Sequence, residues 1–341
     1  MPPVCLPVAR NGEPKMIKIG ILGAAKIAPK ALIPQVKRRS DCTLVAVAAR
    51  DGEKARAYAT QHGIPEVVDS YEALIAHPGI DLIYNALPPN RHADLSIAAL
   101  EAGKHVLCEK PFAMNAAEAR AMAGAAARTG KHLLEAFHYR FHPMFLDILE
   151  KVRGGAIGTL CAMKAEFSVM IPYSADELRH RPDLGGGALM DLGCYPLHWL
   201  RTIAGNEPDL VSARIEEGTP GVDLVTEAEL AFPGGIPGRI RTSMKQGQKT
   251  RAFIALKGSE GVLRAMNPLH PSKGNSISIQ RGDSVERYTV DGETTYDYQL
   301  AHMIDVIAGR AAPLTGGEDA IANMAMIDAI YEAGGLKPRG T

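Results

Sequence analysis

The residues Gly23-Ala24-Ala25-Lys26-Ile27-Ala28 have the spacing G-x-A-x-x-A and directly follow the apolar run Lys18–Leu22. The related pattern G-x-G-x-x-G binds dinucleotides. Its first glycine allows a tight turn from strand to helix, the second lets the backbone approach a pyrophosphate, and the third lets helix pack on strand. Alanine at the second position tolerates a phosphate less well but does not exclude it. The helix expected after the turn would present free N–H groups to the anion. The residues predicted to bind the dinucleotide are Gly23, Ala25, Lys26 and Ile27; a small-residue turn after any buried strand is the alternative.

The end of the second predicted strand, Thr43–Ala49, bears on which dinucleotide binds. An acidic side chain there hydrogen-bonds the ribose 2′-hydroxyl of NAD, whereas arginine accommodates the 2′-phosphate of NADP. Here Arg50 follows Ala49, and a guanidinium stays charged and binds phosphate through a planar fork. NADP is therefore favoured over NAD. Two alternatives stay open: Arg50 is a solvated residue at the start of a helix, or Asp51 binds the ribose of NAD.

The strands and helices that must position this turn are predicted from short apolar runs that alternate with helical patterns. Strands too short and too apolar to have a wet face indicate a parallel sheet covered on both sides, and right-handed crossovers lead to a doubly wound fold. The predicted strands are Lys18–Leu22, Thr43–Ala49, a short one near Val67, Leu82–Asn85, His105–Cys108 and His132–Ala136. The predicted helices are Lys26–Arg38, Glu53–His62, one from Tyr71, Arg91–Ala102, and Ala116–Thr129 with Asn115 as its cap and Gly130 after it.

The chain changes character near residue 150, where strands follow one another without helices between them. This pattern indicates a mainly antiparallel sheet. A helix over Met144–Val152 precedes the strands, and two helices, Tyr298–Ala308 and Glu318–Ala333, follow them. The predicted strands are Leu160–Val169, Val211–Ile215, Ala228–Phe232, Arg239–Ser243, Arg251–Lys257, Val262–Ala265, Ser276–Gln280 and Val285–Val290.

Three motifs resemble the glucose–fructose oxidoreductase/inositol dehydrogenase/rhizopine catabolism (Gfo/Idh/MocA) family. They are Glu109-Lys110-Pro111 after the fifth strand, Asn85–His92 (NALPPNRH) after the fourth, and Gly185–Tyr195 (GGGALMDLGCY) in the second half. The segment Leu314–Ala320 also agrees. The nonapeptide Glu135–Pro143 (EAFHYRFHP) is similar to the branch of dihydrodiol dehydrogenase, D-xylose dehydrogenase and anhydrofructose reductase.

The composition, the change of pattern near residue 150 and the resemblance together predict how the chain is divided. Residues 1–15 are expected to be a disordered extension, 16–140 a dinucleotide-binding Rossmann domain, and 141–341 an α+β domain for substrate binding and dimerisation. The C-terminal helices are expected to pack back on the first domain. The fold class is thus α/β, a doubly wound parallel sheet followed by a large, mainly antiparallel one.

The resemblance also implies which residues act. The further cofactor-binding residues are Leu87, Pro88, Asn90, His92, Glu109 and Lys110, with a cis peptide bond before Pro111. Lys110 follows a strand end, where open α/β sheets bind ligands, and its ammonium would stabilise a developing alkoxide. Tyr195, with an ordinary pKa of about 10, becomes a usable acid/base if a nearby cation lowers that pKa. Asp191 lies four residues earlier on the same predicted helix face, where Pro196 should introduce a kink.

Each role has a structural alternative. Lys110 could be a solvated surface charge, Tyr195 a core aromatic residue and Asp191 a helix cap. The family often carries histidine where this chain has Tyr195, which moves proton transfer to tyrosine and leaves His198 open. His142 and His198 are expected to be packed or exposed histidines. For Tyr139, Arg140 and Arg181, the sequence does not decide between a substrate contact and a structural role.

Composition limits the function classes. The 341 residues carry 38 basic and 38 acidic side chains, so the net formal charge of zero removes the broad attraction that non-specific nucleic-acid or membrane binding needs. No run of about 18 apolar residues predicts a membrane span. Five scattered cysteines favour reduced thiols in the cytoplasm over disulfides or a metal site.

The sequence therefore predicts an NAD(P)-dependent oxidoreductase, with NADP favoured. Its expected substrate is a secondary alcohol or ketone of a sugar or cyclic vicinal diol, and its expected assembly a homodimer or dimer of dimers. The alternative is a catalytically silent dinucleotide-binding sensor of the same fold.

Overall fold

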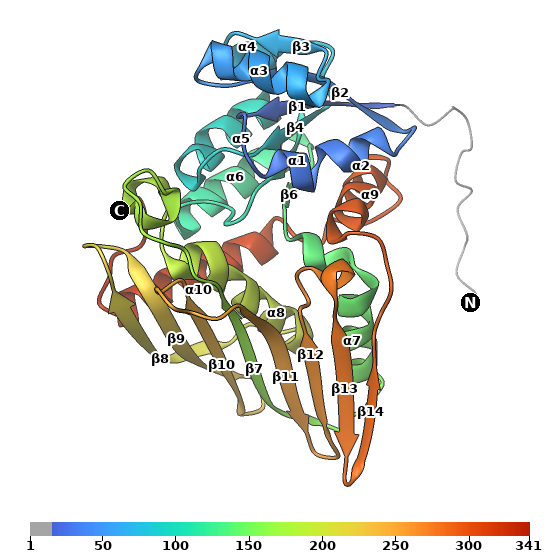
Figure 1. Cartoon of the computed structure of the whole chain (residues 1–341), viewed down its shortest axis with the longest axis vertical. Coiled ribbons are helices and arrows are strands. Elements are labelled where there is room, and N and C mark those ends of the chain that lie inside the picture. Colours follow the sequence, from blue (N-terminus) through green and yellow to red (C-terminus); the bar gives the residue numbers. More distant parts are fainter. Residues whose placement is uncertain (1–15) are drawn as a thin grey trace.

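Six short apolar strands form the first sheet, in the upper part of Figure 1. The structure is a computed structural model that describes residues 16–341, so the extension predicted for residues 1–15 lies outside the described residues. The strand order is β3-β2-β1-β4-β5-β6 and every pairing is parallel. The strands are β1 (Ile17–Leu22), β2 (Cys42–Ala48), β3 (Glu66–Val68), β4 (Leu82–Asn85), β5 (His105–Cys108) and β6 (Leu133–Glu135). The order reverses between β1 and β4, and ligands bind at the carboxyl ends of strands beside such a switch point.

Helices cover both faces of this sheet. They are α1 (Ala28–Ala31), α2 (Ile33–Lys37), α3 (Gly52–His62), α4 (Tyr71–Ala76), α5 (His92–Glu101) and α6 (Ala116–Thr129), with the 3-10 turn η1 (Pro89–Arg91) before α5. Helix α6 has the predicted ends: Asn115 accepts the N–H of Glu118, and Gly130 adopts the left-handed conformation. The single helix predicted over Lys26–Arg38 is wrong. The chain breaks at Leu32, and the second segment starts afresh with Pro34 in its first turn, where a missing N–H costs little.

Eight strands form the second sheet, in the lower part of Figure 1. The order is β14-β13-β12-β11-β7-β10-β9-β8, and the pairing is antiparallel except between β7 and β10. The strands are β7 (Leu160–Ser168), β8 (Asp209–Glu217), β9 (Asp223–Phe232), β10 (Ile236–Ser243), β11 (Arg251–Gly258), β12 (Val262–Met266), β13 (Ser276–Arg281) and β14 (Ser284–Tyr288). The predicted fold class, a doubly wound parallel sheet followed by a mainly antiparallel one, is confirmed.

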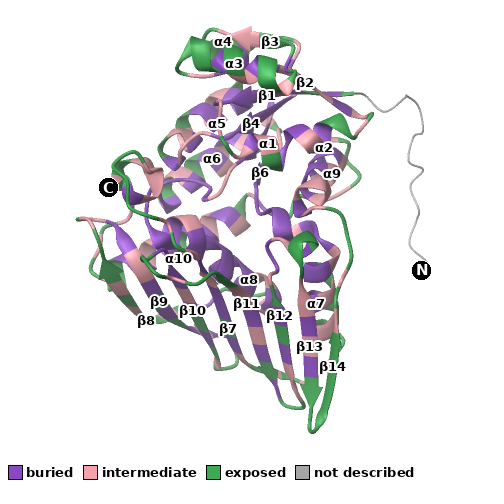
Figure 2. Ribbon diagram, in the orientation of Figure 1, coloured by how far each residue is buried: buried purple, intermediate pink, exposed green. Residues whose placement is uncertain are grey.

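One face of the second sheet is packed and the other is open. Along β9, Ala228 and Leu230 are buried while Glu227 and Glu229 are exposed, and Figure 2 shows the same banding across the sheet. The helices of this part are α7 (Pro143–Arg153), α8 (Cys194–Ala204), α9 (Thr295–Ile307) and α10 (Glu318–Ala333). Helix α8 contacts β7 and β10, and α10 contacts β8. Short helical turns complete the chain: η2 (His138–Phe141), η3 (Leu178–His180), η4 (Pro182–Leu184), the π-helix η5 (Leu189–Gly193) and η6 (Pro271–Lys273).

The last two helices tie the domains together. Leu300 and Met303 of α9 share a buried cluster with Ile19 and Ile21 of β1, so α9 covers part of the first sheet. Helix α10 contacts α6, where Asp328 accepts the N–H of Ala116 at 2.8 Å. Within residues 16–341, no helix has the length and apolar character needed to cross a membrane.

Candidate active site

A cavity of about 1320 Å³ lies between the two domains. On the first domain's side it is lined by the turns that follow β1, β2 and β4. On the other side are residues 167–195 and the segment near His270 and Tyr296. Lys110, Asp191 and Tyr195 all line this cavity, so the three residues predicted to carry the chemistry lie in one cleft.

The turn after β1 lines the first domain's side of the cleft. Gly23 has a φ of 95°, and a Cβ there would lie 2.9 Å from Cδ2 of Leu87, so this position favours glycine. The carbonyl of Ala25 accepts a hydrogen bond from the hydroxyl of Tyr58 at 3.1 Å. The predicted residues Gly23, Ala25, Lys26 and Ile27 all line the cleft, as does Ala24, and α1 begins only at Ala28.

Arg50 and Asp51 follow β2 and both line the cleft. Arg50 is exposed. The carboxylate of Asp51 caps α3 by accepting the N–H groups of Glu53 and Lys54 at 3.0 and 3.1 Å. The side chain of Asp51 is therefore already engaged, whereas the Arg50 guanidinium is open to the cleft.

The loop after β4 brings Leu87, Pro88 and Asn90 to the cleft, but not His92. The buried His92 ring bridges two carbonyls, with Nε2 2.8 Å from the oxygen of Leu87 and Nδ1 2.9 Å from that of Pro111. His92 therefore lies behind the first domain's side of the cleft, where it holds this loop to the one that contains Lys110.

Lys110 follows β5, and its amine crosses the cleft to the second domain. Nζ donates to the backbone carbonyl of Asp191 at 2.7 Å and to Oδ1 of the same residue at 2.9 Å. The Lys110–Pro111 bond is cis, as the resemblance implied. Burial lowers the pKa of Lys110, but the carboxylate of Asp191 raises it to a net value above the ordinary one, so the amine is a cation.

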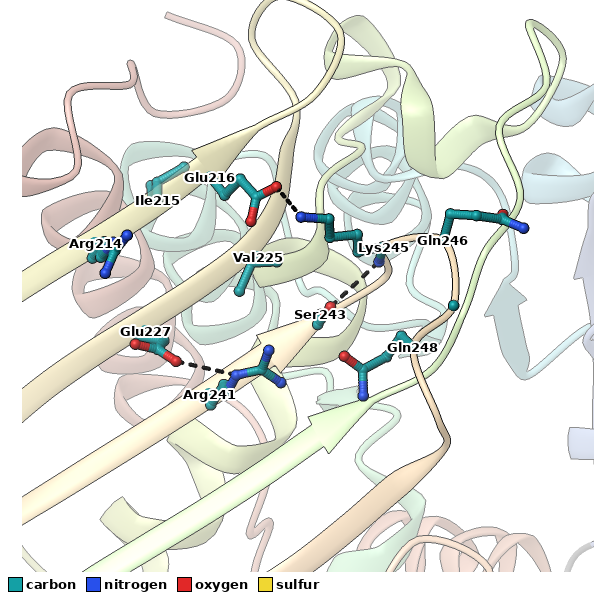
Figure 3. Close-up of a pocket in the computed structure, with 11 residues that line it drawn as sticks. Arg214, Ile215, Glu216, Val225, Glu227, Arg241, Ser243, Lys245, Gln246 and Gln248 are labelled. Carbon is teal, nitrogen blue, oxygen red and sulfur yellow. Dashed lines mark hydrogen bonds and ion pairs between the residues drawn. The ribbon is translucent and has the colours of Figure 1, made fainter.

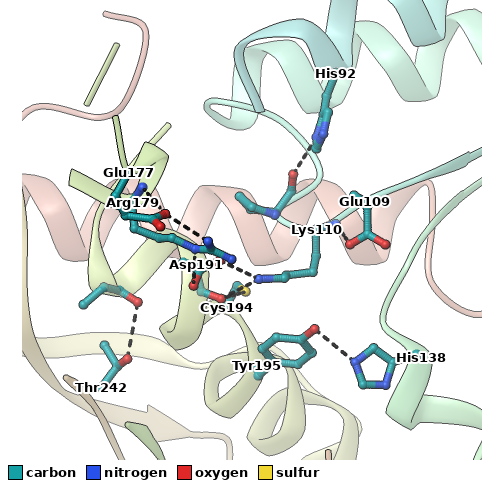
Figure 4. A network of polar contacts seen from close by, with 12 residues as sticks. His92, Glu109, Lys110, His138, Glu177, Arg179, Asp191, Cys194, Tyr195 and Thr242 are labelled. Carbon is teal, nitrogen blue, oxygen red and sulfur yellow. Dashed lines mark hydrogen bonds and ion pairs between the residues drawn. The ribbon is translucent and has the colours of Figure 1, made fainter. Parts of the chain in front are cut away.

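Asp191 also accepts a hydrogen bond from a second cation, Arg179, which the sequence did not indicate. Nε of Arg179 donates to Oδ2 of Asp191 at 3.2 Å, and NH1 of Arg179 donates to Glu177 at 2.9 Å (Figure 4). Burial raises the pKa of Asp191, but Lys110 and Arg179 bring the net value down to about 2. Arg179 lies in η3, in a segment without regular periodicity, so no spacing in the sequence linked it to Asp191.

The helix expected to carry Asp191 and Tyr195 is irregular. Residues Leu189–Gly193 form a π-helix, and α8 begins at Cys194. Pro196 cannot donate to Leu192, and π-turns often occur at functional sites. The predicted disturbance at Pro196 thus takes the form of a π-turn ahead of the proline.

Tyr195 is buried among aromatic rings, 5 % exposed. Nζ of Lys110 lies 5.2 Å from the ring centroid, and the hydroxyl is 3.3 Å from Nε2 of His138 (Figure 4). The expectation that a cation lowers the pKa of Tyr195 is wrong. Burial raises this pKa well above the ordinary value, and negative charges at neighbours such as Glu109 and Asp191 add to the rise. The phenol therefore stays protonated.

Glu109 lies in the floor of the cleft beside Lys110. Its Oε1 accepts the hydroxyl of Tyr84 at 2.5 Å, and burial raises the pKa of this carboxyl above its usual range. Within residues 16–341, no group of three or more histidine, cysteine or acidic residues could hold a metal ion.

The residues whose roles the sequence left open lie in different parts of the structure. His142 caps α7 through Nδ1, which accepts the N–H of Met144 at 3.0 Å. Tyr139 and His198 bond each other, and neither lines the cleft. The Arg140 guanidinium packs 5.8 Å from the Phe145 ring. Arg181 lines the cleft and pairs with Asp183 at 2.6 Å.

Comparisons with known proteins show the family of the chain. Residues 17–137 match the oxidoreductase family with an NAD-binding Rossmann fold, GFO_IDH_MocA, and residues 145–264 match the GFO/IDH/MocA C-terminal domain. The resemblance predicted from the sequence motifs is confirmed.

Curated relatives and solved structures are similar over most of the chain. A D-xylose 1-dehydrogenase (NADP(+)) of Haloferax volcanii is 33% identical over 317 residues, 92% of this chain and 96% of the relative. A trans-1,2-dihydrobenzene-1,2-diol dehydrogenase of Xenopus laevis is 40% identical over 195 residues, 57% of this chain and 58% of the relative. The crystal structure of an aldose-aldose oxidoreductase from Caulobacter crescentus, complexed with glycerol, has a TM-score of 0.86 at 26% identity, covering 94% of this chain and 98% of that one.

Proposed function

The chain belongs to the Gfo/Idh/MocA oxidoreductase family, and we propose that it transfers a hydride between a nicotinamide cofactor and a secondary alcohol or ketone of a sugar or cyclic vicinal diol. The observation that carries this proposal is the convergence of an amine, a carboxylate and a phenol in one cleft, from Lys110, Asp191 and Tyr195. The substrate class follows relatives that are named for a sugar and for a cyclic diol.

The first domain's side of the cleft fits a dinucleotide. Gly23 has no side chain where a Cβ would meet Leu87 at 2.9 Å, so the turn stays narrow and its backbone is open to a pyrophosphate. Leu87, Pro88 and Asn90 would flank the cofactor, and Glu109 and Lys110 would lie at its nicotinamide end. When bound, the cofactor supplies or accepts the hydride.

Lys110 and Asp191 prepare the cleft for a charged oxygen. An ammonium has three N–H donors, and two of those on Lys110 go to Asp191. The third is left for the substrate oxygen, whose developing negative charge the cation stabilises. Asp191, ionised and held by Arg179 from the other side, fixes the direction of the amine.

Tyr195 exchanges a proton with the substrate oxygen. In the reducing direction, its hydroxyl donates the proton that the substrate's carbonyl oxygen acquires as the carbonyl carbon is reduced. In the oxidising direction, the phenolate takes the proton back from the alcohol. Because burial keeps the phenol protonated, the reducing direction starts from the form that the protein already stabilises.

We propose NADP as the preferred cofactor. Arg50 is exposed and lines the cleft after β2, where a guanidinium can bind a 2′-phosphate. The alternative of a ribose contact through Asp51 is weakened because that carboxylate caps α3.

Turnover is the test of the proposed function. Purified protein is mixed with NADP or NADPH and a panel of aldoses, ketoses and cyclic vicinal diols, and the absorbance of the reduced cofactor is followed. We expect turnover of at least one sugar or diol, faster with NADP than with NAD. Cofactor binding without turnover across the panel would favour the silent sensor.

We also propose a homodimer, or a dimer of dimers, through the open face of the second sheet. Figure 3 shows polar side chains from neighbouring strands on this face, with Arg241 paired to Glu227 and Lys245 paired to Glu216. An open sheet face commonly pairs with a second copy in an isologous contact. A cytoplasmic location is proposed from the cysteines, since the four in residues 16–341 are free thiols.

Light scattering tests the assembly. The single chain has a mass of 36.5 kDa, and we expect two or four times that mass in solution. Ala255 lies on the open face, opposite Lys164 and Arg264 in the register, so Ala255→Arg should reduce the mass. A wild-type protein with the mass of one chain would contradict the proposal.

A further inference from the structure

We propose that His138 is a positioning residue for Tyr195, and that its Nε2–H donates to the phenol oxygen so that the phenol's own proton is aimed at the substrate. This inference rests on the proposed function, because it assigns a role in the same proton transfer. It adds a residue that the sequence motifs did not single out.

The contacts of His138 place it directly behind the tyrosine. His138 opens the turn η2, is 4 % exposed and lines the cleft. Its Nε2 is 3.3 Å from the hydroxyl of Tyr195, and its Nδ1 is 2.7 Å from Oγ1 of Thr295 (Figure 4 shows the first of these contacts). Hydrogen bonds of catalytic groups are often long before the substrate arrives and tighten in the complex.

The hydroxyl of Tyr195 has no competing partner among the hydrogen bonds of residues 16–341. Lys110 lies over the ring, 5.2 Å from its centroid, and its amine is bonded to Asp191 instead. His138 is therefore the group that can orient the phenol before substrate binds.

Distances indicate the direction of this hydrogen-bond chain. The hydroxyl of Thr295 has one proton, which can go to Nδ1 of His138 at 2.7 Å or to the carbonyl of Leu269 at 3.4 Å. The 2.7 Å contact suits an O–H donor, whereas a donor in the opposite direction would leave the Thr295 proton only the 3.4 Å contact, at the limit of hydrogen bonding. The proton of Thr295 therefore goes to His138.

A neutral imidazole that accepts at Nδ1 carries its proton on Nε2. Burial lowers the pKa of His138 well below its usual value, and positive charge at His270, Lys110 and His142 lowers it further, so the ring is neutral. The chain then runs from Thr295 to His138 to Tyr195 and leaves the phenol proton for the cleft.

Packing holds the imidazole in this orientation. The His138 ring stacks on that of His270, with centroids 5.6 Å apart and planes at 14°, and lies 4.3 Å from the ring of Tyr296.

His138 also acts during the proton transfer. When Tyr195 gives its proton to the substrate oxygen, the Nε2–H of His138 stabilises the phenolate that remains. His138 keeps its own proton, and Tyr195 regains one from water when the product leaves.

A double-mutant cycle tests the role in turnover. His138→Leu removes the donor, and a hydrogen bond to a charged group is worth about 1.5–3 kcal/mol, so kcat for ketone reduction should fall about 10- to 100-fold with KM nearly unchanged. His138→Gln offers an amide N–H near the same point and should recover most of the rate. In a Tyr195→Phe background, His138→Leu should cost less than about twofold more. An equal loss in both backgrounds would mean that His138 acts only through folding, and the proposal would fall.

A measurement without turnover separates this inference from the proposed function. In ¹⁵N-histidine-labelled protein, the imidazole signals of His138 are identified by their loss in His138→Gln. We expect a neutral ring protonated on Nε2, whose Nε2 shift changes in Tyr195→Phe. A ring protonated on Nδ1, or one indifferent to Tyr195, would overturn the inference. If this result is as expected but no substrate turns over, the proposed function fails and the hydrogen-bond assignment stands.

Discussion

The two sides of the cleft are built by different means. The first domain's side is mostly backbone: the turn at Gly23 and the loop that His92 holds through two carbonyls. The second domain's side is made of side-chain groups, with Asp191 and Tyr195 in and after a π-turn. This difference indicates that cofactor binding depends on the conformation of the backbone, whereas the reaction of the substrate depends on individual side-chain atoms.

The largest effect is expected at the substrate side, which the Lys110 amine reaches from the first domain through its bonds to Asp191. Lys110→Met removes the cation and Tyr195→Phe removes the proton donor, and each should lower kcat at least about a hundredfold, equivalent to about 2.7 kcal/mol. Steady-state kinetics with a substrate found in the panel measure this loss. Cofactor affinity, followed by fluorescence titration, should change little in Tyr195→Phe. A variant with a near-normal rate would remove that residue from the mechanism.

On the cofactor side, the largest effect should come from the backbone. Gly23→Ala places a Cβ 2.9 Å from Leu87 at a φ of 95°. Backbone strain of this kind costs about 1–3 kcal/mol, so the Kd for NADP should rise by about tenfold or more, as titration would show.

Gly130→Ala is the matched control for Gly23→Ala. Gly130 also has a positive φ, of 63°, but nothing lies within 4 Å of its added Cβ, and it ends α6 away from the cleft. It should lower the thermal midpoint without changing cofactor affinity. Equal losses of affinity in both variants would mean that the turn at Gly23 has no special relation to the cofactor.

The sequence predicted the local elements of the first domain better than the contacts that cross the cleft, for a physical reason. Strand ends and small-residue turns are local, so β1, Gly23 and the cap at Asn115 follow from neighbours in the chain. The break at Leu32 was missed because the apolar pattern continues through it, although Pro34 limits the backbone there.

Long-range contacts explain what the sequence could not give. Arg179 meets Asp191 only because an irregular segment folds over the cleft, and His138 meets Tyr195 across 57 positions of the chain. The motifs brought Lys110, Asp191 and Tyr195 to notice, but the raised pKa of Tyr195 depends on burial that no spacing reveals.

A single side chain on the cofactor side should have a moderate and selective effect. Arg50→Ala removes the guanidinium proposed to bind the 2′-phosphate, so KM for NADP should rise about tenfold while KM for NAD changes little. Parallel initial-rate measurements with both cofactors test this. Arg56→Ala, in the helix α3 that follows Arg50 but outside the cleft lining, is the control. Equal changes for NADP and NAD would contradict the proposed preference.

The smallest effect is expected for an exposed ion pair of the first domain. Arg128 and Glu101 lie 3.5 Å apart with side chains 65% and 57% exposed, whereas those of Lys110 and Asp191 are 15% and 14% exposed. Because water and salt screen exposed pairs, Glu101→Ala should change the free energy of unfolding by less than about 0.5 kcal/mol in urea titrations. A loss of free energy of unfolding above about 1 kcal/mol would show that the stability of the first domain also depends on individual exposed side chains. Only the turn at Gly23 would then distinguish the two sides of the cleft.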